Sequence, residues 1–258
     1  MSIFSALDFL NIFSVNRGIR LFYSSLNIYN FMDSYSAERI EVSQTLLIRK
    51  VYVWMCAALL ITAGTAYRVS NSEELLRAIF SSNIRFFGII IVQFAIVWFL
   101  SARIKTLTFT TATILFALYS VLMGITMSCI FLAYTQTSIT STFLITAGTF
   151  GVMSIYGFTT KKDLTSLGGL LMMGVIGIII AMVVNYFLKS SKFDFIISCI
   201  GVLIFVGLTA YDTQKIKALL NQENTDENQK MAIIGSLMLY LDFINLFLFL
   251  LRIFGRRR

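Results

Sequence analysis

The chain has 258 residues, of which 57% are hydrophobic and only 13% are charged, whereas soluble domains average about 25% charged residues. This composition indicates an integral membrane protein. The net charge of +8 comes from basic residues in short loops and at the C-terminus, which argues against a nucleic-acid-binding face, and the absence of histidine excludes Ser-His-Asp triads and His-rich zinc sites.

Residues 1–46 differ from the rest of the chain because they hold no run long enough to cross a membrane. Apolar residues recur at helical spacing from Ile3 to Phe13, which is compatible with an interfacial amphipathic helix. A poorly ordered extension is an equal alternative. The segment lacks a basic n-region and a small-residue cleavage site, so it is not expected to be a signal peptide.

Residues 47–258 are expected to form an all-α transmembrane domain. A helix needs roughly 20 apolar residues to cross the hydrocarbon layer, and the chain contains seven such runs. Ala147 and Gly151 are four residues apart within one run and predict a close helix contact. The polar segment 215–230 is expected to be a solvent loop. The seven predicted spans are 51–69, 86–103, 107–134, 138–159, 166–188, 195–214 and 231–252.

The distribution of Lys and Arg favours an N-terminus on the cytoplasmic side. In that orientation nine basic residues flank the spans on the inner side and five on the outer side. The tail Arg256–Arg258 would then face outward, against the rule. Six crossings would place this tail inside, but seven runs are the better count.

One charged side chain lies deep in the last span. Asp242 is the only charged residue from Met231 to Leu251, and a charge at that depth costs roughly 2.5–3.5 kcal/mol on insertion scales. A second acid, Asp212, ends the preceding span. Two carboxylates in contact cannot both ionise cheaply, so one of them tends to keep its proton, and the protonation of the pair depends on pH. This predicts an ion or proton site, although an acid pair that only joins two helices is an alternative.

Other polar residues could support this pair. Asn245 is three residues after Asp242, so both are expected on one helix face, and their oxygens suit Ca²⁺. Arg103 ends the second span on the same side as Asp212, so a latch between the two is allowed, and a snorkelling boundary arginine is the alternative. Counted from the span ends, Asp242 and Asp212 differ in depth by on the order of 10 Å, so contact requires helix tilt or a water cavity.

Four segments make the chain resemble the bacterial branch of the Bax inhibitor family. The resemblance covers about residues 49–255, and the last two segments carry most of it. The segments are RKVYVWM (49–55), YGFTTKKDLTSLG (156–168), GLTAYDTQKIK (207–217) and LYLDFINLFLFLLRIFG (239–255).

This resemblance implies a bundle of seven transmembrane helices with the last helix central, in a bacterial inner membrane. It implies a pH-sensitive calcium leak with Asp212 and Asp242 as the acid pair and Arg103 as the latch. Relatives can carry a glutamate inside the second span, whereas in this chain the nearest polar residue is Gln93, which cannot ionise.

Some relatives are instead associated with a membrane-bound ATP-dependent protease, so a membrane-embedded modulator of such a complex is the second hypothesis. Apart from the calcium ion and membrane lipids, no cofactor is expected. An enzyme is not expected, because no nucleophile–base pattern or nucleotide motif is present.

Overall fold

The protein is described from a computed structural model, which covers residues 45–219 and 226–258. The expected amphipathic helix or extension within 1–46 therefore lies outside the described residues, apart from its last two positions. Seven helices in the described part are long and apolar enough to cross a membrane, which confirms the expected all-α bundle. The first span runs from Thr45 to Ser70.

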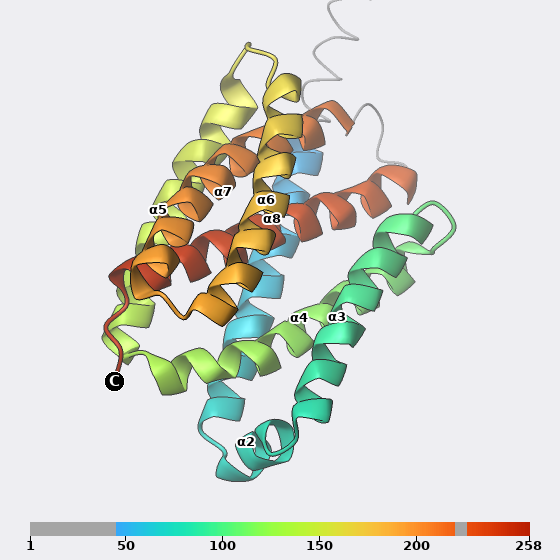
Figure 1. Ribbon diagram of the computed structural model, residues 1–258. Helices are drawn as coiled ribbons and strands as arrows, with labels where there is room; N and C mark the ends of the chain where they lie inside the picture. The colour runs from blue at the N-terminus through green and yellow to red at the C-terminus, as the bar shows by residue number, and fades with distance from the viewer. Residues whose placement is uncertain (1–44, 220–225) are drawn as a thin grey trace, which may run out of the picture. The chain divides into compact units, whose positions relative to one another are not determined.

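The remaining helices follow in chain order (Figure 1). They are α2 (Glu73–Phe80), α3 (Asn83–Arg103), α4 (Phe109–Ala133), α5 (Gln136–Thr159), α6 (Thr165–Leu188), α7 (Ser191–Leu219) and α8 (Asp226–Phe254). The short exposed helix α2 lies outside every predicted span, between the first span and the second.

The boundaries follow local chemistry. Without proline the apolar runs continue unbroken as helices, which satisfy every backbone group in lipid. Thr108 and Thr135 begin α4 and α5 by accepting a backbone N–H with their hydroxyl groups. The expectation of a solvent loop over 215–230 was too wide, because α7 continues to Leu219 and α8 begins at Asp226.

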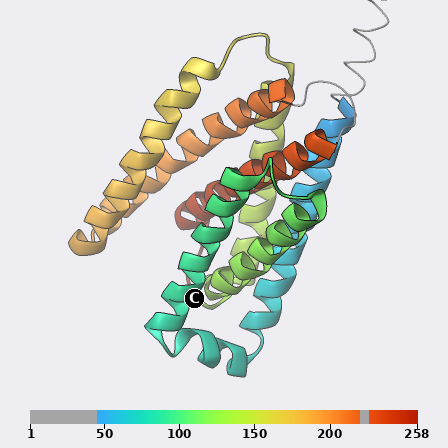
Figure 2. The same ribbon diagram turned by 90° about the vertical axis from the view of Figure 1, so that its right-hand side faces the viewer.

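Helix α8 is the centre of the bundle. In its apolar stretch 72% of the residues are buried, compared with 44% or less in every other span. It packs against α4, α5 and α7, and among helices α2–α8 its contact with α7 is the most extensive. Helices α6 and α7 lie side by side (Figure 2). The expected central position of the last helix is confirmed.

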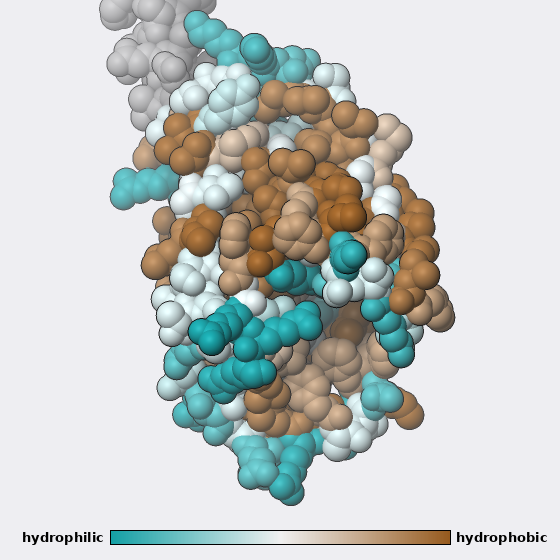
Figure 3. Space-filling model, turned by 60° about the vertical axis from the view of Figure 1, so that its left-hand side comes forward, coloured by the Kyte–Doolittle hydropathy of each residue, from teal (hydrophilic) through white to brown (hydrophobic). Residues whose placement is uncertain are grey.

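Apolar side chains also cover much of the outer surface. Large residues such as Ile84, Phe94 and Trp98 on α3 are more than 70% exposed. Figure 3 shows a broad apolar area on one face, with hydrophilic residues at its upper end and over its lower part. Such a surface is stable in lipid and would be an aggregation hazard in water.

The C-terminal tail is attached to the turn between α4 and α5. Arg257 forms an antiparallel bridge with Tyr134, and the N–H of Thr135 donates to the Arg256 carbonyl at 3.0 Å. The tail and this turn therefore lie at the same end of the bundle. Four spans, α5 to α8, separate the turn from the tail, and an even number of crossings returns the chain to the same side, as the seven-span prediction requires.

Candidate functional site

The two acids of the sequence analysis meet inside the bundle. Asp212 on α7 and Asp242 on α8 are 9% and 5% exposed, and their carboxyl groups lie close enough to interact directly. An ionised carboxylate only accepts hydrogen bonds, so a hydrogen bond between the two groups would require one of them to carry a proton. Two neighbouring buried carboxylates are costly when both are charged, which favours a pair that shares one proton.

The antiparallel packing of α7 on α8 brings the two acids together. Ile216 lies against Gly235 at one end of the contact, and Phe205 stacks on Phe249 at the other, with ring centroids 5.8 Å apart. Asp212 and Asp242 fall in the same antiparallel register between these two contacts. The acids therefore face each other because of the helix register, and Gly235 keeps the contact with the Ile216 side chain close.

The difference in depth expected from the span ends does not keep the acids apart. Helix α8 is inclined relative to α7 (Figure 1), and its first turns extend beyond the point where Ile216 meets Gly235. Helix tilt, one of the two conditions anticipated, thus brings Asp212 and Asp242 to the same level.

One oxygen of the pair has no partner. Among the described residues, no group donates a hydrogen bond to the buried Oδ2 of Asp242. A buried acceptor without a donor costs about 1–3 kcal/mol. This oxygen is therefore the position where a proton, a water molecule or a cation would be most favourably added.

The residues around Asp212 connect it to three other elements. Thr213 lies within 3.4 Å of the Tyr52 hydroxyl of the first span. Gly157 on α5 and Gly168 on α6 allow close packing, because a Cβ at either would overlap Ala210 or the Tyr211 ring. The segment from Ala210 to Thr213 is thereby fixed by neighbours on several sides, which sequence reasoning did not identify.

The next residues of α7 fasten the loop between α5 and α6. Gln214 accepts the N–H of Leu164 and donates to the Lys162 carbonyl, both at 2.8 Å. Lys217 donates to the Phe158 carbonyl at 2.9 Å and lies over its ring. The segment GLTAYDTQKIK alone does not reveal this role, because the residues that Gln214 and Lys217 contact lie 50 to 59 residues away in the chain.

Arg103 is at the end of α3 and its side chain is exposed. No ion pair joins it to Asp212 within residues 45–219 and 226–258. The cation that acts on the charge of Asp212 is Lys215, one turn further along α7. The Arg103 latch thus stays a prediction for a different state of the protein.

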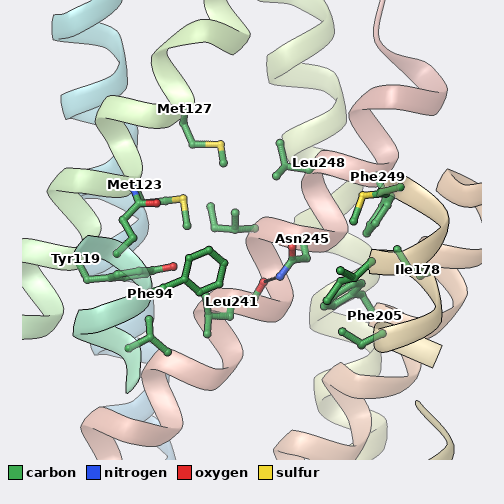
Figure 4. A pocket seen from close by; sticks show the side chains of 16 residues that line it. Phe94, Tyr119, Met123, Met127, Ile178, Phe205, Leu241, Asn245, Leu248 and Phe249 are labelled. Carbon is green, nitrogen blue, oxygen red and sulfur yellow. Dashed lines mark hydrogen bonds between the residues drawn. The ribbon is translucent and has the colours of Figure 1, made fainter. Parts of the chain in front are cut away.

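Asn245 and Gln93 do not join the acid pair. Both line a cavity of about 400 Å³ whose lining does not include Asp242 (Figure 4). The Asn245 amide donates to the Leu241 carbonyl at 2.8 Å, and the Gln93 amide donates to Thr126 at 3.2 Å. A supporting role of Asn245 and Gln93 at the acid pair therefore stays a prediction.

The acid pair offers few ligands for a resident metal. Within the described part of the chain, no group of three or more acidic, cysteine or histidine side chains could hold an ion. Ca²⁺ takes six to eight oxygen ligands, so two carboxylates would need water and backbone oxygens to complete its shell. The pair suits an ion in passage better than one held permanently.

Comparison with known proteins agrees with the fold and the motif. The family described as "Inhibitor of apoptosis-promoting Bax1" matches residues 44–258. The chain is 50% identical over 212 residues to the inner membrane protein YbhL of Escherichia coli K12, covering 81% of this chain and 91% of that protein. It is 50% identical to a Borreliella burgdorferi protein over 82% of this chain and 92% of that protein. The seven spans and this similarity identify a multi-pass protein of the bacterial inner membrane.

Proposed function

The chain belongs to the Bax inhibitor family of membrane proteins, and we propose that it is a calcium leak pathway gated by protonation of Asp212 and Asp242. The adjacent buried acids at the centre of the bundle carry this proposal. Losing the shared proton places two negative charges side by side in a buried place. That change repels the two helices and attracts a cation.

The unpartnered Oδ2 of Asp242 supports the same function. A purely structural acid pair would be more stable if both oxygens were satisfied, because an unmet buried acceptor is costly. An oxygen left open on the most buried helix is suited to receive a passing cation.

Aromatic packing next to the pair supports a closed state of the proposed path. Phe243 follows Asp242 on α8 and packs edge-on against Phe143 and Phe150 of α5, each with ring centroids 5.4 Å apart. An ion could not pass this aromatic packing, so flux requires α8 to move relative to α5. Charging the acid pair supplies a force for that movement.

Calcium flux into liposomes that contain only lipid and purified protein tests the proposal. Flux through the wild type should change between about pH 6 and 8, whereas Asp242→Asn and Asp212→Asn should flatten the profile, because neither variant can place two charges together. Asp163→Asn is the matched control, since Asp163 is an exposed loop acid, and it should behave as the wild type.

Two results would overturn the proposal. An unchanged pH profile in both pair variants would exclude the pair as the sensor. A folded wild type that carries no calcium would exclude the leak itself. The modulator hypothesis predicts that second result, because it needs a partner complex that these liposomes lack.

A further inference from the structure

The cavity of about 400 Å³ lies between α3 and α4 on one side and α6, α7 and α8 on the other (Figure 4). Phe94 of α3 and Ile179 of α6 line it and are 73% and 51% exposed. The cavity therefore opens sideways, toward the lipid-facing surface. Its volume is in the range of sites that hold small ligands, about 300–1,000 Å³.

Three polar groups inside this cavity are incompletely bonded. Tyr119 is only 3% exposed, yet its hydroxyl has no hydrogen-bond partner among the described residues, and Figure 4 shows it directed toward the open space. The carbonyl oxygens of Gln93 and Asn245 likewise receive no hydrogen bond in the described part of the chain, since each side chain only donates from its amide. A buried tyrosine hydroxyl normally finds a partner, so the missing partner points to a ligand.

The rest of the lining selects the chemistry of that ligand. None of the 16 described lining residues is charged. The Arg252 guanidinium lies over the Phe249 ring but is paired with Asp194 at 3.7 Å, so a carboxylate or phosphate in the cavity would lack a free counter-charge, at high cost. Met123, Met127 and Met182 contribute flexible, polarizable side chains that adapt to an irregular apolar guest.

We propose that the cavity binds one chain of a neutral membrane amphiphile, such as a monoacylglycerol, which enters sideways between α3 and α6. The uncharged head exchanges hydrogen bonds with Tyr119, Gln93 and Asn245, and the acyl chain lies among the methionines. This proposal does not depend on the ion pathway, because Asp212 and Asp242 do not line the cavity.

Photo-crosslinking tests it with the full chain in nanodiscs of phosphatidylethanolamine and phosphatidylglycerol. The probe is monooleoylglycerol with a diazirine in its acyl chain, and labelled peptides are mapped by mass spectrometry. Unlabelled monooleoylglycerol, oleate and lysophosphatidylglycerol compete for the site. We expect label on α4 and α8, and displacement by monooleoylglycerol at about tenfold lower concentration than by either charged lipid.

Two variants on neighbouring residues of α6 separate the cavity from the lipid-facing surface. Val175 lines the cavity, so Val175→Trp should reduce labelling about tenfold or more. Ile176 is 57% exposed and does not line it, so Ile176→Trp should label as the wild type does. Tyr119→Phe should reduce labelling roughly three- to tenfold, the range for one hydrogen bond.

Equal labelling of the two tryptophan variants would overturn the proposal, as would equally strong competition by oleate, or label outside the cavity helices. If Val175→Trp fails to fold, two measurements decide the result: the relative strength with which the three lipids compete, and the labelling of Tyr119→Phe. Full displacement by charged lipids together with unchanged labelling of Tyr119→Phe would then reject the site.

Discussion

Replacing Gly157 by alanine should weaken the packing that positions the acid pair. A Cβ at this position of α5 would overlap the Ala210 carbonyl oxygen and stand 2.9 Å from the carbonyl carbon and the Cα of that residue. Side-chain carbons essentially never approach within 3.0 Å, and the atoms involved are backbone atoms that cannot rotate away. Helix α5 must therefore move away from α7, two residues before Asp212.

The cost can be bounded from similar overpacking, which destabilises proteins by typically 1–3 kcal/mol. Gly151→Ala is the matched control on the same helix, because its Cβ would meet nothing within 4 Å. Alanine is the better helix former by about 0.8–1.0 kcal/mol, so Gly151→Ala should be as stable as the wild type or more stable. The two alanine variants should thus differ by at least about 1 kcal/mol in free energy of unfolding.

Unfolding in mixed micelles, followed by circular dichroism, measures this difference. The pH profile of calcium flux should also change in Gly157→Ala and stay unchanged in Gly151→Ala, if α5 holds Asp212 in place. Equal unfolding free energies for the two variants would refute the reasoning, because they would show that the α5–α7 contact adjusts without cost.

Three further predictions concern other parts of the chain. Reporter fusions after residues 222 and 258 should report opposite sides of the membrane, with the C-terminus outside; the same side for both would exclude seven crossings. If ionised Asp212 attracts Arg103, Arg103→Gln should raise calcium flux at high pH and leave it unchanged at low pH, where the acid is neutral; equal effects at both would remove the latch. The pKa of exposed Asp163 is lowered because it accepts hydrogen bonds from the side chain and backbone of Thr165, so its stabilisation of the start of α6 is present above its unfolded pKa and lost as pH falls through the lowered value. An NMR titration should place its midpoint below that of an aspartate in an unfolded peptide, and Thr165→Ala should raise it.

Hydropathy was sufficient to predict the spans. Each predicted span lies within six residues of the observed bounds at both ends, because apolar runs this long can only cross a membrane as helices. The sequence also allowed the prediction that Asp242 has a polar partner, since an isolated charge at its depth is costly. The sidedness of the chain stays a prediction, as the helices alone do not orient it.

The contacts between helices could not be read from one sequence. Gly151 fits a small-residue pattern and meets nothing, whereas Gly157 and Gly168 make close contacts without such a pattern. Helical spacing placed Asn245 with Asp242, but spacing cannot tell which neighbour covers each face of a helix buried all round. The register of α7 on α8, along which Ile216 meets Gly235 and Phe205 meets Phe249, decides those contacts.

The central position of α8 links the two proposals. One face of this helix presents Asp242 to α7, another packs Phe243 against α5, and a third lines the cavity with Leu241 and Asn245. A movement of α8 that opens the aromatic packing must also reshape the cavity, because a close-packed helix cannot shift on one side only. A ligand that fits the cavity of this closed form would then stabilise it against the open one. By linkage, the charge on the acid pair should in turn change the affinity for that ligand by the same factor.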